Sequence, residues 1–348
     1  MNLAKEAAYR EETAYQTRQK RVNCMAYKYF FAFVLLLIGG LPSRALGQSP
    51  PEKVVITYPS RSIASIDLYI ARDLGFFREE GLDADLVQVR GNVAISAGLT
   101  GQVHAINNVG TVIRAIERGD VPFKVMAVSL KRNLFWLVAR PEFGSIRELK
   151  GKSLGTTTFG GSQHMAAARL LRKGGLDPEK DITVVVGGDV PTQLQGLVTG
   201  VIQVAALSPP TVILARDKFK MRILGSALEE GFNLQNGIAV SETLLRERRD
   251  SVRRILRARS KASRYFWENE RGTANVLAKY LHVELSVALE SYRLARSAFS
   301  TDSIPTAKEI EEFLKMEAEI LKLAKPSPPS KVFDFTLQQL VNRELGLR

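Results

Sequence analysis

Three serines, Ser60, Ser62 and Ser65, stand immediately before a segment that predicts a helix ending at Gly75. A serine at a helix start accepts a hydrogen bond from a backbone N–H that would otherwise lack a partner. The same N–H groups carry a partial positive charge, so a helix start can also bind an anion. Both roles stay open for this loop, and both rest on hydrogen bonding.

Residue types suited to covalent or metal chemistry are few. The only cysteine is Cys24, and His104, His164 and His282 lie far apart without the spacing of a metal site. The Gly-Gly-Ser segment at 160–162 lacks the G-x-S-x-G pattern of a nucleophile on a strand-to-helix turn. We therefore expect no disulfide, no metal, no cofactor and no catalytic residue, and do not expect an enzyme.

Short apolar segments alternate with helical segments over the middle of the chain. Strands are predicted at residues 53–58, 85–89, 103–107, 123–128, 134–139, 153–157, 182–186, 201–207 and 221–224. This alternation predicts an α/β protein with open, mostly parallel sheets flanked by helices. Ligands of such sheets bind beyond the carboxyl ends of the strands, where this chain has polar loops.

The corner of the first β-α-β unit is the segment Ile70–Leu82. Gly75 and Gly81 stand where a chain leaving a helix needs positive φ, which glycine adopts without strain. Phe76 and Phe77 between them are predicted to anchor the corner in the core.

Two parts of the sequence resemble one another. Leu99-Thr-Gly-Gln-Val-His-Ala-Ile106 matches Val198-Thr-Gly-Val-Ile-Gln-Val-Ala205, and Gly110-Thr-Val-Ile113 matches Pro210-Thr-Val-Ile213. Each copy holds a helix, a glycine stop, a strand and a polar loop. Two such units predict two lobes with a cleft between them, an architecture that encloses a small molecule.

The first 47 residues predict a targeting segment. An apolar run at 29–41 is shorter than the roughly 20 residues that a membrane-spanning helix needs. Basic residues precede it and Ala45-Leu-Gly47 follows, which is typical of a signal peptide cleaved between Gly47 and Gln48. An uncleaved anchor is the alternative, and a translation start at Met25 is a further hypothesis. We expect an exported, periplasmic protein.

The last third is predicted to be helical and the chain is basic, with a formal net charge of +13. No run of Lys and Arg is interleaved with aromatic residues, so we expect no nucleic-acid partner. Nine cations between Arg246 and Arg264 predict either a solvated helix face or a patch for a partner or membrane.

Three features together resemble a known family. They are Ala71-Arg-Asp-Leu-Gly-Phe-Phe-Arg-Glu-Glu-Gly-Leu82, the two Thr-Gly units of the repeat, and Ile146-Arg-Glu-Leu-Lys-Gly-Lys-Ser153. They are similar to periplasmic substrate-binding proteins of ABC importers for alkanesulfonates, taurine, nitrate and thiamine-pyrimidine precursors. The resemblance covers about 52–270. It implies a two-lobed type II periplasmic-binding-protein fold, with lobe 1 at 52–135 plus 230–348, lobe 2 at 136–229, and a helical C-terminal tail.

The resemblance also implies a ligand site built from four loops. Its ligand-binding residues are expected to be Tyr58, Ser60, Ser62, Ser65, Asn107, Asn108, Thr111, Thr158, Phe159, Gly161, Ser162 and Ser208. The chain departs from the family pattern at His104 and Gln203, where an aspartate is usual, and we expect these two positions to shape strands rather than the site.

The resulting prediction is a monomeric solute-binding protein that captures a small organic molecule between its lobes and delivers it to an ABC permease and ATPase. Hydroxyl and N–H donors favour an anionic head group such as sulfonate, nitrate or carboxylate. Stacking of a heterocycle on Tyr58, Phe159 or Trp136 is the alternative. A ligand-sensing protein without a transporter, and an enzyme of thiamine-pyrimidine metabolism, are the other hypotheses; the cysteine-rich iron motif of that enzyme branch is absent.

Overall fold

The computed structural model describes residues 50–119 and 121–347. The predicted signal peptide at 1–47, its cleavage after Gly47 and the alternative start at Met25 lie outside these residues. Within them, no helix combines the length and the apolar character needed to cross a membrane.

The described residues form two five-stranded sheets. The first sheet has the order β2 (Leu82–Gln88), β1 (Glu52–Tyr58), β3 (Ala105–Ile106), β10 (Phe232–Ser241) and β4 (Phe123–Arg132). The second sheet has the order β7 (Ile182–Val186), β6 (Lys152–Thr156), β8 (Val204–Leu207), β5 (Trp136–Ala139) and β9 (Arg222–Ser226).

Both sheets are mixed and have the same plan. In the first sheet β1 pairs in parallel with β2 and β3, whereas β10 runs antiparallel to its neighbours β3 and β4. In the second sheet β6 pairs in parallel with β7 and β8, and β5 runs antiparallel to β8 and β9. All strands except β10 and β5 therefore point the same way within their sheet, and the matching plans confirm the predicted repeat.

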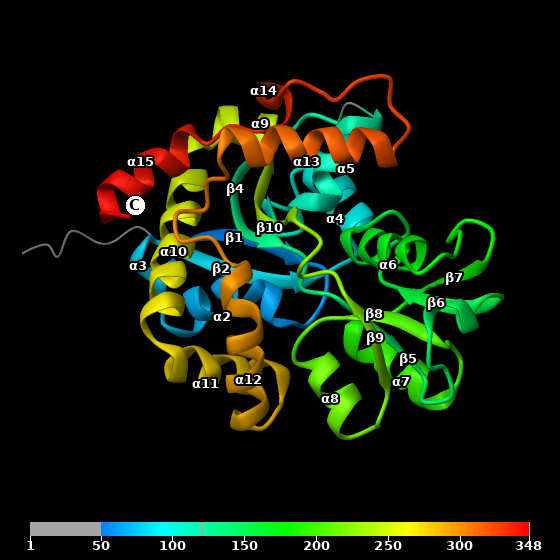
Figure 1. Cartoon of the computed structure of the whole chain (residues 1–348). Coiled ribbons are helices and arrows are strands. Elements are labelled where there is room, and N and C mark those ends of the chain that lie inside the picture. Colours follow the sequence, from blue (N-terminus) through cyan, green and yellow to red (C-terminus); the bar gives the residue numbers. More distant parts are fainter. Residues whose placement is uncertain (1–49, 120, 348) are drawn as a thin grey trace, which may run out of the picture. The chain divides into compact units, whose positions relative to one another are not determined.

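Helices flank both sheets (Figure 1). Those in the first two thirds of the chain are η1 (Ile63–Ser65), α2 (Ile66–Asp73), α3 (Phe76–Glu79), α4 (Gly91–Leu99), α5 (Val109–Gly119), η2 (Ile146–Leu149), α6 (Ser162–Lys173), α7 (Val190–Thr199) and α8 (Thr211–Asp217). Those of the C-terminal third are α9 (Glu242–Glu247), α10 (Arg249–Glu268), α11 (Glu270–Leu281), α12 (Leu285–Ala295), η3 (Arg296–Ala298), α13 (Ala307–Ile320), α14 (Pro329–Val332) and α15 (Thr336–Leu345).

The sheets exchange strands at the two places where the chain crosses between them. β5 follows β4 directly but joins the second sheet, and β10 follows β9 but joins the first. The sequence predicted no strand at 232–241, so β10 corrects that prediction. Its polar residues Asn233, Gln235 and Asn236 are buried and interrupt the apolar pattern on which strand prediction depends. The lobe boundaries at 135–136 and 229–230 stay a prediction.

Local features that the sequence predicted are present. Gly75 and Gly81 have φ of 78° and 68°, and Phe77 is buried at the corner they define. His104 Nδ1 accepts a hydrogen bond from Val55 N on β1 at 3.0 Å. Gln203 Oε1 does the same for Ser153 N on β6 at 3.1 Å, so both residues hold strands as expected.

The cations of α10 mostly pair with acidic residues. Arg254 contacts Glu52, as does Arg248 at the N-cap of α10, and Arg257 contacts Glu80 and Glu344. Arg259, fully buried, pairs with Asp67 at 3.2 Å. These ion pairs indicate that the cations of α10 mainly bind acidic residues of the same chain and do not form a patch for a partner.

Candidate functional site

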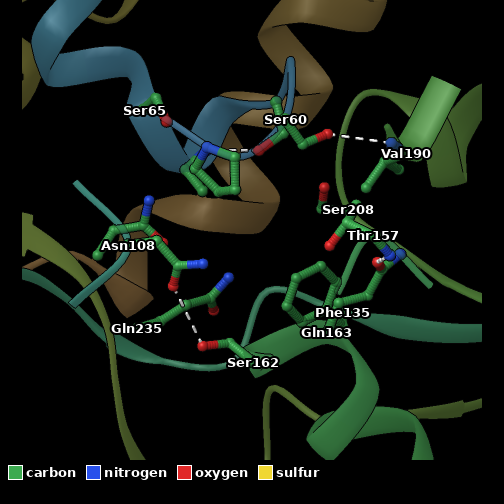
Figure 2. Close-up of a pocket in the computed structure, with 14 residues that line it drawn as sticks. Ser60, Ser65, Asn108, Phe135, Thr157, Ser162, Gln163, Val190, Ser208 and Gln235 are labelled. Carbon is green, nitrogen blue, oxygen red and sulfur yellow. Dashed lines mark hydrogen bonds between the residues drawn. The ribbon is translucent and has the colours of Figure 1, made fainter. Parts of the chain in front are cut away.

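A small cavity lies where loops of the two sheets meet, with a volume of about 30 Å³. That volume is close to the roughly 30 Å³ that one water molecule occupies in the liquid. Figure 2 shows the cavity and the side chains around it. Its walls are formed by Pro59, Ser60, Ser62, Ala64, Ser65, Asn108, Phe135, Thr157, Ser162, Gln163, Val190, Ser208, Gln235 and Asn236.

The loop after β1 supplies one wall, and its three serines have different roles. Ser62 Oγ caps η1 by accepting a hydrogen bond from Ala64 N at 3.1 Å. Ser60 Oγ instead accepts from Val190 N at 3.0 Å, at the start of α7 on the other side of the cavity. Ser65 donates to Asn107 Oδ1 at 2.9 Å. Of the three, Ser62 alone caps the helix that follows it, so the other two hydroxyls organise the cavity wall.

The N-terminus of α6 supplies the opposite wall. Ser162, its first residue, donates to Asn108 Oδ1 at 3.4 Å and accepts from Arg114 Nη1 at 3.3 Å. Arg114 is buried and forms two hydrogen bonds with Glu317 on α13, of 2.6 Å and 2.8 Å. A helix N-terminus and a guanidinium behind its first hydroxyl both favour negative charge in the cavity.

The cavity offers mainly uncharged hydrogen-bond donors. Ser208 Oγ is buried and has no partner among the described residues. The side-chain amides of Asn108 and Gln235 face the same space in Figure 2. Gln235 Oε1 accepts a hydrogen bond from Leu134 N at 3.3 Å. No lining residue is a histidine, a cysteine or a carboxylate, and no cluster of metal-binding side chains exists in the described ranges. The wall is suited to binding and holds no general acid or base.

Six of the predicted site residues line this cavity: Ser60, Ser62, Ser65, Asn108, Ser162 and Ser208. Of two others, Asn107 supports the wall from behind, and Tyr58 precedes the lining residue Pro59 in the chain. Asn107 Oδ1 accepts from Ser65 and from Asn236 Nδ2, the latter at 2.6 Å. Tyr58 is half-buried and packs edge-on against Tyr69, with ring centroids 5.6 Å apart.

The other four predicted residues lie away from the lining. Thr111 and Thr158 each have a buried hydroxyl without a partner among the described residues. Gly161 is the N-cap of α6 but is not part of the wall. Phe159 is 65% exposed and lines a different cavity. The structure therefore does not bring Phe159 together with the serines, and a role of Phe159 in binding the same ligand stays a prediction.

Several lining residues were missed from the sequence. Thr157 and Gln163 lie next to the predicted loop, and Gln163 is held by Thr157 N at 2.8 Å and Ala206 O at 2.7 Å. Phe135, Gln235 and Asn236 come from the two chain crossings. The available signal for the site residues of β10 was the pair Gln235 and Asn236 beside apolar residues, because amides that become buried normally have a specific partner or role.

Contacts between the loops around the cavity hold it shut. Arg61 Nε donates to Asp189 Oδ2 at 3.0 Å, and Gln88 Nε2 donates to the same oxygen at 3.2 Å. Ile63 N donates to Pro209 O at 3.1 Å. Burial raises the pKa of Asp189, but hydrogen bonds from Thr192 and Arg61 outweigh burial and hold that pKa below its usual value. The Asp189 carboxylate is thus a stable anion at the rim.

Comparisons with known proteins find one curated relative and many solved structures of the same fold. The Bacillus subtilis (strain 168) protein YtlA, whose given name proposes that it is a binding protein, is 24% identical over 84% of this chain and 89% of its own length. The alkanesulfonate-binding protein SsuA of Xanthomonas axonopodis pv. citri, bound to MOPS, matches with a TM-score of 0.65 at 15% identity, covering 84% of this chain and 98% of that one. The periplasmic nitrate-binding protein NrtA of Synechocystis PCC 6803 matches with a TM-score of 0.67 at 13% identity, covering 84% and 88%.

An enzyme shares the fold as well. A mutant of DszB, in complex with biphenyl-2-sulfinic acid, matches with a TM-score of 0.61 at 12% identity and covers 84% of this chain and 99% of that one. At these identities the structural matches show the fold of periplasmic binding proteins and leave the activity open. The family model described as NMT1/THI5 like matches residues 62–271, which is more than half of the chain, so this protein belongs to the NMT1/THI5-like family.

Proposed function

We propose that this protein is the solute-binding component of an ABC importer and that its ligand is a small organic molecule with an anionic head group. Sulfonate, carboxylate and nitrate are the head groups whose oxygens match the donors on the wall, and the cavity of about 30 Å³ must widen to admit one of them. The observation that carries the proposal is the set of donors facing one small space, above all the buried Ser208 hydroxyl without a described partner. A buried donor without an acceptor is unfavourable, and a ligand oxygen would satisfy it.

Electrostatics supports an anion over a cation. The lining contains no carboxylate, and the nearest buried charge behind Ser162 is the guanidinium of Arg114. Glu317 neutralises Arg114, but Arg169 on α6 adds a second, partly buried cation close to the same pair. The N-terminus of α6 contributes its partial positive charge directly at Ser162.

The proposed cycle is capture between two lobes. The ligand would enter while the contacts of Arg61 with Asp189 and of Ser60 with Val190 are broken, because these contacts and their neighbours close the cavity. Closure would re-form these contacts around the head group. Binding shifts a protein toward its closed state only by the extra contacts that this state provides, and the loop donors are those contacts.

An importer component of this kind would be exported, monomeric and in contact with a permease. SsuA of Escherichia coli and NrtA are both described as periplasmic, which supports export of this chain. Binding rather than catalysis is supported by the lining itself, which offers hydroxyls and amides without a base to activate them. DszB keeps an enzyme among the candidates on fold alone.

A thermal-unfolding screen tests the proposal. The panel holds alkanesulfonates, nitrate, bicarbonate, aromatic acids and neutral pyrimidines. A ligand present at 100 times its Kd stabilises the folded protein by about 2.7 kcal/mol. Ser208→Ala should weaken the affinity for the best anion about fivefold to tenfold, since a hydrogen bond contributes about 1 kcal/mol.

Ser96→Ala is the matched control, because Ser96 is exposed on α4 and bonds only its own helix. It should leave the affinity unchanged. A panel in which pyrimidines stabilise the protein and all anions fail would replace the anionic ligand by a heterocycle. Turnover of any panel member by the purified protein would replace binding by catalysis.

A further inference from the structure

A second cavity lies outside the candidate ligand site. It has a volume of about 370 Å³ and shares no lining residue with the small cavity. Phe159, Gly160, His164 and Arg118 form the part of its wall that matters here, and we call it the Phe159 cavity. Its size falls in the range of roughly 300–1,000 Å³ that is common for small-molecule sites.

One side of the Phe159 cavity is apolar. Phe159 is 65% exposed and is the only aromatic residue among the exposed large apolar side chains of the described part of the chain. Its ring lies against the ring of His164, with centroids 4.6 Å apart and planes inclined by 32°. Met165, Ile182 and Ile320 continue the apolar surface from α6, β7 and α13. A flat apolar group can lie on this surface.

The other side of the Phe159 cavity is cationic. Arg118 is exposed at the end of α5 and has no acidic partner among the described residues. It lies close to the Phe159 loop, because a Cβ built on Gly160 would be 3.5 Å from Arg118 Nη1. Arg172 also lines the cavity and pairs with the exposed Glu179 at 3.3 Å. Two arginines against one glutamate leave the wall positively charged.

His164 adds a neutral donor between these two sides. Gly160 N donates to His164 Nδ1 at 3.1 Å, so the ring hydrogen must be on Nε2. Burial, with the charges of Arg114 and Arg172, lowers the pKa of His164 to about 4. The ring is therefore uncharged near neutral pH, and its Nε2–H has no acceptor among the described residues. The lowered pKa also agrees with a positive potential at this wall.

We propose that the Phe159 cavity is a second binding site, for a small amphipathic anion whose acidic group pairs with Arg118 and whose aromatic or aliphatic body lies on Phe159. A carboxylate or a sulfonate accepts from a guanidinium through two oxygens and can accept from His164 at the same time. The flat side of an aromatic body matches the exposed ring. This site is independent of the proposed import function, because the two cavities have separate walls.

Titration calorimetry with 2-naphthoate tests the site. Arg118→Gln should weaken 2-naphthoate binding about tenfold or more, because a charge-assisted pair is lost. Phe159→Ser should weaken it about tenfold, because the apolar support is lost. The neutral analogue 2-naphthamide should bind the unchanged protein more weakly than 2-naphthoate and should not respond to Arg118→Gln. Both substituted residues are exposed, so both variants should fold, which thermal unfolding checks.

Two matched control variants test whether 2-naphthoate binds in the Phe159 cavity. Arg147→Gln removes an arginine that does not line the cavity, and Val201→Ser removes an apolar side chain that is 70% exposed. Both should leave the Kd of 2-naphthoate unchanged. The proposal is overturned if 2-naphthoate does not bind, if Arg118→Gln and Phe159→Ser bind it normally, or if Asn108→Ala in the small cavity abolishes binding while the two variants of the Phe159 cavity do not.

Discussion

Replacing Glu317 by glutamine should destabilise the protein strongly. Glu317 is fully buried on α13, and its two carboxylate oxygens accept from Arg114 Nε and Nη2 at 2.6 Å and 2.8 Å. The side chain of Arg114 is only 3% exposed. Glutamine keeps the volume of the residue but removes its charge, so Glu317→Gln leaves a buried guanidinium without its counterion.

The expected loss is about 3–5 kcal/mol in the free energy of unfolding, which is the range for breaking a buried ion pair by removing one partner. A second cation places the value at the upper end. Arg169 Nη1 and Nη2 are buried and have no described partner, and burial lowers the pKa of Arg169 while the charge of Glu317 opposes that shift. Without Glu317, two cations would remain in one buried cluster.

Urea unfolding followed by circular dichroism measures this loss. The control is Glu290→Gln, which breaks the exposed pair between Glu290 and Arg216 and should cost less than about 1 kcal/mol. A second measurement uses the double variant Arg114→Met with Glu317→Leu, which replaces the buried ion pair by two apolar side chains. This variant should recover most of the stability that Glu317→Gln loses. A loss below about 1 kcal/mol for Glu317→Gln would show that the pair does not hold α13 in place. No recovery in the double variant would show that the loss does not come from an unpaired buried charge.

Three further predictions concern pH and packing. The free energy of unfolding should fall as the pH drops from about 6.5 to 4, because His164 is protonated at a higher pH in the unfolded chain than in the folded protein. The loss is about 1.4 kcal/mol for each unit by which the pKa of His164 differs between the two states. His164→Gln should flatten this part of a series of unfolding curves measured at different pH values. The lowered pKa of Asp189 contributes stability above about pH 3.8 that is lost below it, so Asp189→Asn should make the acid limb of the same series shallower. Gly237→Ala should cost at least about 2 kcal/mol, since its Cβ would lie 1.9 Å from Ala127 O, whereas Gly119→Ala, with nothing within 4 Å, should be neutral in urea unfolding.

The sequence predicted the α/β architecture because its signals are local. Glycine stops and apolar strand segments depend on residues close together in the chain, and the repeat is found by comparing two such local patterns; all appear in the structure. β10 was missed because its position between β3 and β4 is set by tertiary contacts that its own polar sequence does not reveal. A strand buried on both sides can carry amides where partners from other segments satisfy them, as Asn107 does for Asn236.

The site was predicted at the level of loops and not at the level of side-chain direction. Six of the named residues reach the small cavity, but Phe159 points into a different one. The backbone geometry of the Gly-rich loop decides this direction, since Gly160 has φ of 73° and turns the chain between Phe159 and the start of α6. The composition and spacing of the residues do not predict the direction of the Phe159 side chain, because a change in the backbone angles of one residue can move a side chain to the opposite face.

The exchanged strand β10 has a consequence for the order in which this protein can be made. Among the described strands, β4 has β10 as its only neighbour in the first sheet, yet β10 is synthesised after the whole of the second sheet. A chain still emerging from the ribosome, or from a membrane channel, therefore holds β3 and β4 with open edges until residue 241 has appeared. Open strand edges pair readily with other chains. A growing chain of this protein is thus exposed to misassembly from the completion of β4 until the completion of β10, and a chaperone that covers strand edges would protect it during this interval.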